Sequence, residues 1–230
     1  MAGDARLTPG YYIQADDLGP HVTGVLACSS VFDIKSAMAA LFTDGADRLR
    51  DEHRGVVQDG ALLEGDVIVQ AGARIEAGAQ VMGPVLVCAG AVVAAGALVR
   101  DHSVIGPGCR IGFGAEITRS LLAGHVFMKH PCFVGDSVIG RRVNLGSFSS
   151  TTGLRCDRGP VAEPAIEEIT VTLDGRRIST GQTKFGAVIG DDVALPAGTI
   201  LSPGTLIGPG TVLYPRDHIG GFLPAGTRVR

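Results

Sequence analysis

The chain has 230 residues, a net charge of −3 and 45% hydrophobic residues, of which few are aromatic. Its near balance of 20 basic and 23 acidic residues excludes the broad basic surface typical of nucleic-acid-binding proteins, and no run approaches the ~18 apolar residues of a membrane span. The 34 glycines predict many turns, and the shortage of aromatics predicts a core of Val, Ile, Leu and Ala.

Residues 1–60 carry no regular repeat. Within them, Asp33 precedes the segment IKSAMAALF, a pattern typical of a short helix with an N-terminal capping residue, and Gly45 follows as a stop signal. We expect residues 1–60 to form an N-terminal cap whose helix closes the first coil of the next domain.

From Leu63 onward, branched aliphatic residues recur every six positions. The first block reads Leu63, Val69, Ile75, Val81, Val87, Val93, Val99, Ile105, Ile111 and Ile117, and the second reads Ile189, Leu195, Leu201, Ile207, Leu213 and Ile219. A small or β-branched residue lies two positions before nearly every one of them, and a glycine often follows three positions after, as at Gly72 and Gly78. Neither the 3.6-residue period of a helix nor the strict alternation of hairpin strands fits a six-residue step.

A six-residue step with a recurring corner predicts a triangular solenoid. Three short strands make one coil, and parallel strands stack ~4.8 Å apart on the coils above and below. We therefore predict an all-β fold over residues 61–230, a parallel β-helix of the hexapeptide-repeat type.

One interruption of the repeat lies at residues 118–133, TRSLLAGHVFMKHPCF. This segment loses the glycine corners and brings in His125, Lys129 and His130. Since a residue that disturbs a regular repeat usually has another reason to be there, we expect a functional site in this segment.

A second interruption, at residues 154–183, leaves the solenoid as an excursion. Its stretch ITVTLDGRRIS predicts a β-hairpin that turns at Asp174 and Gly175. Insertions in repeat proteins commonly lie on one face, so we expect the hairpin to project from one edge.

The cysteines and the N-terminus bear on the compartment. The cysteines are odd in number and form no C-x-x-C pair, which indicates neither a disulfide framework nor a zinc site; they are Cys28, Cys88, Cys109, Cys132 and Cys156. The start MAGDARLTPG lacks the basic and apolar segments of a signal peptide. We expect a cytoplasmic protein.

Three stretches carry a resemblance to a known family: EITRS, KHPCFVGDSVIGRRVNLGS and TKFGAVIGDDV. They resemble the acetyltransferase half of bifunctional sugar-1-phosphate nucleotidylyltransferase/acetyltransferases, above all the archaeal type, and also that of bacterial N-acetylglucosamine-1-phosphate uridylyltransferase/glucosamine-1-phosphate acetyltransferase. The resemblance covers the chain from about Leu63 to the C-terminus. It implies a left-handed β-helix, a homotrimer whose sites lie between subunits, and acetyl transfer from acetyl-CoA to an amino sugar phosphate without a required metal.

The resemblance also implies roles for particular residues. His130 matches the general base, a role that an imidazole near its usual pKa of about 6.5 can fill. Asn144 matches a sugar-binding residue, Ser147 a backbone position near the thioester carbonyl, and the basic positions for the sugar phosphate are Arg100, Arg119 and Lys184. Ala197 and Ser202 lie in coils along which the pantetheine arm of the donor is expected to run.

Two positions depart from the family pattern, and both are on the acceptor side. Phe133 replaces a tyrosine that helps to place the sugar, and Gly153 replaces an asparagine. Two alternatives to the amino sugar phosphate reading therefore stay open: an acyltransferase of specialised metabolism with another acceptor, and a non-catalytic β-helix that serves as a scaffold. For Cys132, beside His130, we consider both an acyl-carrying nucleophile and a small buried hydrophobic residue, and favour the latter.

Overall fold

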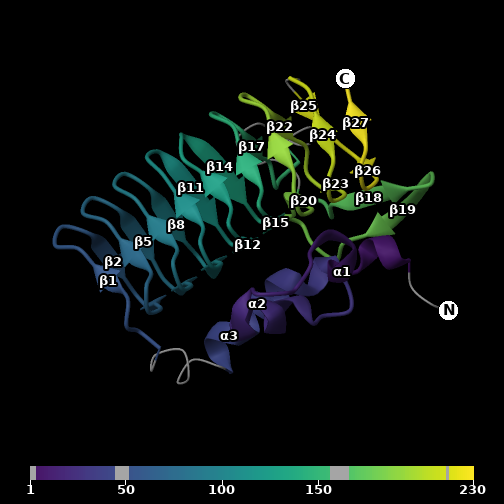
Figure 1. The fold of residues 1–230 in the computed structure, drawn as a ribbon. Helices are drawn as coiled ribbons and strands as arrows, with labels where there is room; N and C mark the ends of the chain where they lie inside the picture. Colours follow the sequence, from purple (N-terminus) through teal and green to yellow (C-terminus); the bar gives the residue numbers. More distant parts are fainter. Residues whose placement is uncertain (1–3, 45–51, 156–165, 216–217) are drawn as a thin grey trace.

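The computed structural model describes residues 4–44, 52–155, 166–215 and 218–230, and its main body is a solenoid of three parallel sheets, as Figure 1 shows. We call them sheets A, B and C. Sheet A contains β1 (Val56–Val57), β4 (Arg74–Ile75), β7 (Val92–Val93), β10 (Arg110–Ile111), β13 (Phe127–Met128), β16 (Asn144–Leu145), β21 (Ala194–Leu195), β24 (Val212–Leu213) and β27 (Arg228–Val229).

The other two sheets contain eight strands each. Sheet B contains β2 (Leu62–Glu64), β5 (Gln80–Met82), β8 (Leu98–Arg100), β11 (Ala115–Thr118), β14 (Cys132–Gly135), β17 (Ser150–Thr151), β22 (Ile200–Leu201) and β25 (His218–Ile219). Sheet C contains β3 (Val67–Val69), β6 (Val85–Val87), β9 (Ser103–Ile105), β12 (Leu121–Gly124), β15 (Val138–Arg141), β20 (Ala187–Ile189), β23 (Thr205–Ile207) and β26 (Phe222–Leu223).

The chain passes from sheet A to sheet B to sheet C in each coil, which confirms the predicted left-handed parallel β-helix. The solenoid starts at Val56, slightly before the predicted boundary at residue 61.

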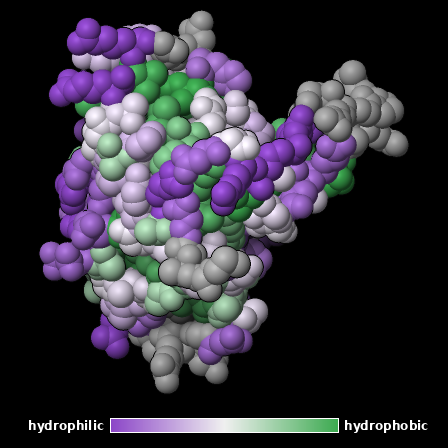
Figure 2. All heavy atoms as spheres, turned by 90° about the vertical axis from the view of Figure 1, so that its right-hand side faces the viewer, coloured by the Kyte–Doolittle hydropathy of each residue, from purple (hydrophilic) through white to green (hydrophobic). Residues whose placement is uncertain are grey.

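The core of the solenoid consists of the six-residue aliphatics, as predicted. Val81, Val99 and Ile117, for example, have no exposed side-chain surface. Leu63 occupies the same repeat position but is 37% exposed, because no coil lies beneath it. Figure 2 looks onto the opposite end of the solenoid, where hydrophobic residues show at the surface between hydrophilic ones. Each coil is therefore buried by its neighbours and not by its own side chains.

The threonines near the C-terminal end of the core satisfy their hydroxyl groups locally. Thr199 Oγ1 donates to Pro196 O (2.8 Å), and Thr211 Oγ1 donates to Gly208 O (2.7 Å). These internal hydrogen bonds let a hydroxyl-bearing side chain take the small-residue position of the repeat without leaving a buried polar atom unpaired.

The coil around the predicted interruption is one residue shorter than the coils before it. Arg74 pairs with Val92 at a spacing of 18 residues, whereas Arg110 pairs with Phe127 at 17. Corners in this part of the chain have positive φ at residues other than glycine, among them Arg119 (45°) and His125 (50°). Residues 118–133 therefore stay within the solenoid and change only its corners.

The N-terminal helices do not close the first coil, which corrects the prediction. They comprise η1 (Ala5–Leu7), α1 (Pro9–Tyr12), α2 (Gly19–Leu26), η2 (Val31–Asp33) and α3 (Ile34–Thr43), and they lie along the outside of sheet C (Figure 1). Along sheet C, one outward-pointing residue of each strand lies in register with those of its neighbours and is apolar, as at Leu86, Val104 and Leu121, and these side chains cluster with Ile34 and Met38 of α3. Burial of this apolar stripe explains why the helices lie on a face and not on an end.

The predicted hairpin forms as β18 (Thr170–Leu173) and β19 (Arg176–Ser179). Asp174 and Gly175 both have positive φ (49° and 76°), as a two-residue turn of this kind requires. Val171 packs with the outer cluster of sheet C, so helices and hairpin together cover that face. The predicted helix stop at Gly45 and the residue Cys156 lie outside the described residues.

Candidate functional site

The corners between sheets A and B, which we call the A/B edge, carry the predicted general base. His130 is exposed in the corner between β13 and β14. Backbone hydrogen bonds join this corner to the next two: Phe148 N donates to Pro131 O (2.6 Å), and Gly198 N donates to Ser147 O (2.8 Å). His130, Ser147 and Ala197 therefore lie on three successive coils along one edge.

The same corners present unused backbone donors. The N–H groups of Ser147 and Ala197 donate no hydrogen bond within the part of the chain that the structure describes. Each belongs to the second residue of a turn, closed by Ser149 N to Gly146 O and by Thr199 N to Pro196 O. Such groups are available to an incoming carbonyl oxygen or amide.

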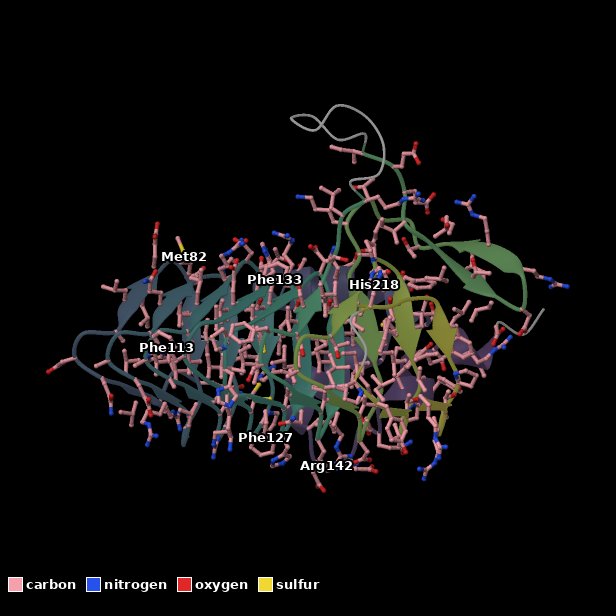
Figure 3. The ribbon with its side chains drawn as sticks, turned by 90° about the horizontal axis from the view of Figure 1, so that it is seen from above. Met82, Phe113, Phe127, Phe133, Arg142 and His218 are labelled. Carbon is pink, nitrogen blue, oxygen red and sulfur yellow. The ribbon has the colours of Figure 1, made fainter. Side chains whose placement is uncertain are left out.

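Aromatic side chains stand out along the A/B edge. Phe113 and Phe148 are each 70% exposed, and the Phe127 ring carries the Lys129 ammonium at 5.1 Å from its centroid. Figure 3 looks down on this edge, with Phe133 on sheet B at one side, Phe127 on sheet A at the other and Phe113 between them. Exposed phenylalanines concentrated on one edge are typical of a contact surface.

Two further predicted residues lie near this edge. Asn144 points outward from sheet A, in register with Phe127 and Ala194. Cys132 points into the core, where its Sγ donates to Gly146 O (3.2 Å) and burial raises the pKa of the thiol. This environment favours the structural reading of Cys132.

The corners between sheets B and C, which we call the B/C edge, gather the predicted cations. Arg100 donates to Glu116 Oε1 (2.7 Å from Nη2) and contacts Asp101 and Thr118 Oγ1. The hydrogen bond to Glu116 holds the pKa of Arg100 above its ordinary value. Carboxylates thus fix the direction of this guanidinium.

Arg119 is held by a buried carboxylate. Its Nε and Nη2 donate to the two oxygens of Asp136 (2.8 and 3.0 Å), and Lys35 Nζ from α3 donates to Asp136 Oδ1 (2.7 Å). Burial alone would raise the pKa of Asp136, but the hydrogen bonds from Arg119 and Lys35 lower it below its usual value. Lys35 Nζ also donates to Lys184 O (2.7 Å), so α3 is tied to the edge at two points.

The remaining predicted residues lie on sheet B or at its far side. The Phe133 ring covers Gly135, since a Cβ at Gly135 would lie 2.7 Å from its Cζ. Gly153 lies beside Asp136, and the exposed Lys184 follows the excursion at the same edge. Ser202 is separated from Ala197 by the width of sheet B, and its Oγ bonds to His218 Nε2 (2.8 Å).

The structure therefore divides the predicted site into two groups on either side of sheet B. Asp136 lies six positions after His130, so in one protomer the two edges lie at most about 20 Å apart. Lys35, Asp101, Glu116 and Asp136 were not predicted. Asp136 lies within the VGDS stretch, which is a sequence signal, whereas nothing local marks Lys35, 101 residues away from its partner.

Among the described residues, no cluster of three or more His, Cys, Asp or Glu side chains is arranged to hold a metal ion. Within the same residues, no helix has the length and apolar character needed to cross a membrane.

The coil pattern and the outward edges define a hexapeptide-repeat β-helix protein. Residues 81–207 match the family model described as the GMPPB C-terminal domain, and the chain belongs to that family.

Similar proteins agree with the resemblance stated above. A bifunctional sugar-1-phosphate nucleotidylyltransferase/acetyltransferase of Sulfurisphaera tokodaii is 32% identical over 164 residues, which is 71% of this chain and 39% of that protein. A putative uncharacterized acetyltransferase of Escherichia coli, YaiX, is 34% identical over 125 residues (54% and 51%). The bifunctional protein GlmU of Methanocaldococcus jannaschii is 33% identical over 147 residues (64% and 34%). The chain spans about half or less of the length of these relatives.

Proposed function

We propose that the chain is a cytoplasmic, CoA-dependent acyltransferase that moves an acetyl group from acetyl-CoA to the amino group of an amino sugar phosphate or a close relative. The observation that carries this proposal is the alignment of His130, Ser147 and Ala197 on three successive coils of an exposed edge. The names of the relatives, which include acetyltransferases and GlmU proteins, support the same reaction class.

The chemistry assigns one role to each group on the A/B edge. The donor supplies an activated acetyl carbonyl as a thioester. His130 takes the proton that the attacking amine loses, and the Ser147 N–H stabilises the negative charge that develops on the carbonyl oxygen. As the new C–N bond forms and the C–S bond breaks, that proton is returned to the leaving sulfur, which balances the transfer.

The corners of the next coil fit the pantetheine arm of the donor. Ala197 adds a second unused N–H to that of Ser147, one coil above, and both residues have small side chains that leave the backbone open. A chain of amides, as in pantetheine, is well matched to backbone donors spaced one coil apart.

A homotrimer explains why the predicted residues fall into two groups. Among the described residues, the helices and the hairpin cover sheet C and leave sheets A and B open, and these two sheets meet at the A/B edge. Three triangular prisms that meet at these edges leave three grooves, each between sheet A of one subunit and sheet B of the next. Each groove then contains Asn144 from one side and Phe133, with Arg100 and Arg119, from the other.

Phe133 favours a second candidate, an acyltransferase whose acceptor is not a simple sugar phosphate. Its ring covers Gly135 on the open face of sheet B and offers an apolar surface where the family pattern has a hydroxyl. Gly153, beside Asp136, likewise lacks the side-chain amide of the asparagine that the family pattern has at this position. Both changes affect recognition of the acceptor and leave the groups of the A/B edge intact.

The test is release of free thiol from acetyl-CoA with a panel of amines. Release with glucosamine-1-phosphate supports the first reading, and release only with other amines supports the second. If the protein binds no CoA at all, the chain is a scaffold and the proposal is wrong.

Two matched variants test the proposed base. His130→Asn is expected to lower turnover by about 10²–10⁴-fold, the usual contribution of a general base. His125→Asn removes another exposed histidine from the same coil, at the corner between sheets C and A, and is expected to leave turnover unchanged. Equal activity of the two variants would remove His130 from the mechanism.

A further inference from the structure

Two cavities meet where helix α3 crosses the B/C edge. One, of about 350 Å³, is lined by Lys35, Arg119, Asp136, Gly181, Gln182, Thr183 and Lys184. The other, of about 280 Å³, is lined by Lys35, Ser36, Met38, Ala39, His102, Arg119 and Gln182. Lys35, Arg119 and Gln182 border both, and together the cavities reach the size typical of small-molecule sites.

The residues at the junction leave cationic donors unused. Lys35 Nζ has three donors, of which Asp136 Oδ1 and Lys184 O take two. Arg119 uses Nε, one Nη2 donor and one Nη1 donor on Asp136 and Asp101, which leaves two of its five. The Lys184 ammonium makes no hydrogen bond or ion pair among the described residues. Three cations and one carboxylate therefore line the first cavity.

Asp136 makes this arrangement rigid. Its side chain is only 6% exposed, and its hydrogen bonds hold Lys35 and Arg119 at fixed positions on either side of it. A site whose cations are already oriented loses less side-chain entropy when it binds an anion. The net positive charge suits one doubly charged group, a terminal phosphate or a diphosphate inside a longer molecule.

The second cavity favours the internal diphosphate over the terminal phosphate. It continues past Lys35 and Arg119 along α3, on the side of the B/C edge away from His130, and its walls include Met38 and Ala39. The His102 ring, held edge-on to Phe42 at 5.9 Å, forms another wall. A terminal phosphate would leave this partly apolar space empty, whereas a group attached beyond the phosphate would fill it.

We propose that this groove binds a diphosphate that lies inside the acceptor, with the amino end over sheet B and a nucleoside-sized group against Met38, Ala39 and His102. The acceptor class is thus an amine carried on a nucleoside diphosphate, and Lys35 is a specificity-determining residue supplied by the N-terminal helices. The amino end of this assignment rests on the proposed function, but the anion and nucleoside parts of the groove do not.

The test measures binding to the whole chain without CoA, using UDP as the nucleoside diphosphate and pyrophosphate as the same anion without its tail. Titration calorimetry is expected to show tighter binding of UDP. Lys35→Met should weaken both ligands by about tenfold or more, the size of one charge-assisted contact. Arg176→Met removes an exposed cation from the hairpin and serves as its control.

A second pair of variants tests the cavity. Ala39→Trp fills it and is expected to weaken UDP while leaving pyrophosphate unchanged, whereas Ala40→Trp, at the exposed neighbouring position, changes neither. Equal binding of UDP and pyrophosphate, equal loss of both in Ala39→Trp, or no binding of either overturns the proposal. The release of free thiol from acetyl-CoA is measured in a separate assay. If the chain binds UDP but releases no thiol, only the proposed function is wrong.

Discussion

The hydrogen bonds around Asp136 are expected to stabilise the folded chain by a measurable amount. The substitution that tests this is Asp136→Asn, which keeps the shape of the side chain and removes its charge. Asp136 accepts three hydrogen bonds from two cations and is 6% exposed, whereas Asp192 accepts two from Arg142 and is 54% exposed. Asp192→Asn is therefore a matched control that differs mainly in burial.

The magnitude follows from burial. Loss of one partner from a fully buried ion pair costs about 3–5 kcal/mol, but Lys35 and Arg119 are 20% and 35% exposed and regain water when Asp136 is neutralised. We therefore expect Asp136→Asn to lower the free energy of unfolding by about 2–3 kcal/mol. Asp192→Asn is expected to lower it by less than about 1 kcal/mol, as for other exposed pairs.

The stabilisation by Asp136 is also expected to change with pH in a definite direction. The folded protein holds the pKa of Asp136 below its usual value, so its contribution is present above the unfolded pKa of about 3.9 and is lost as pH falls through the lower, folded value. Urea unfolding at neutral pH and near pH 3, at one protein concentration, measures both effects. The reasoning is refuted if the two variants unfold alike at neutral pH, or if the gap between Asp136→Asn and the unchanged chain grows on acidification.

Two other predictions concern the coils and the A/B edge. Ile117→Ala is expected to cost about 2–5 kcal/mol in urea unfolding, and Leu63→Ala, at the same repeat position on the open first coil, much less; equal costs would mean that neighbouring coils do not supply the burial. Phe148→Asp places a charge on the proposed threefold contact and is expected to convert trimers to monomers in sedimentation velocity, so an unchanged trimer would place the contact elsewhere.

The six-residue pattern predicted the solenoid because each inward aliphatic is buried by equivalent residues one coil away. Val99 and Ile117 are neighbours in space for the same reason that they are alike in sequence. The hairpin was predicted for a similar local reason, since Asp174 and Gly175 can both take positive φ.

The position of the helices could not be predicted from helix signals, because capping and amphipathicity say where a helix begins and not what it covers. The missing signal lies elsewhere, in the apolar outward residues of sheet C. Leu86 and Val104 are apolar, whereas the equivalent outward residues of the other sheets include Arg74 and Gln80. When the outward residues are compared at steps of 18 residues, one coil apart, those of sheet C are apolar, and this identifies sheet C as the covered face.

The candidate site was predictable only where it follows the solenoid. His130, Ser147 and Ala197 belong to one edge, which coil stacking places in line. The contact of Lys35 with Asp136 depends on how a separate segment docks, and a repeat pattern contains no information on that docking.

The excursion leaves and rejoins the stack without disturbing it: Val138 pairs with Val188, fifty positions later in the sequence, as directly as it pairs with Leu121. Its returning end supplies Gln182 to the groove beside α3, and Lys184 follows directly, whereas His130 lies in a coil that the excursion does not interrupt. Under the proposed function, such a division lets evolution, or a protein engineer, exchange one loop to change which acceptor is modified while the groups of the A/B edge stay untouched.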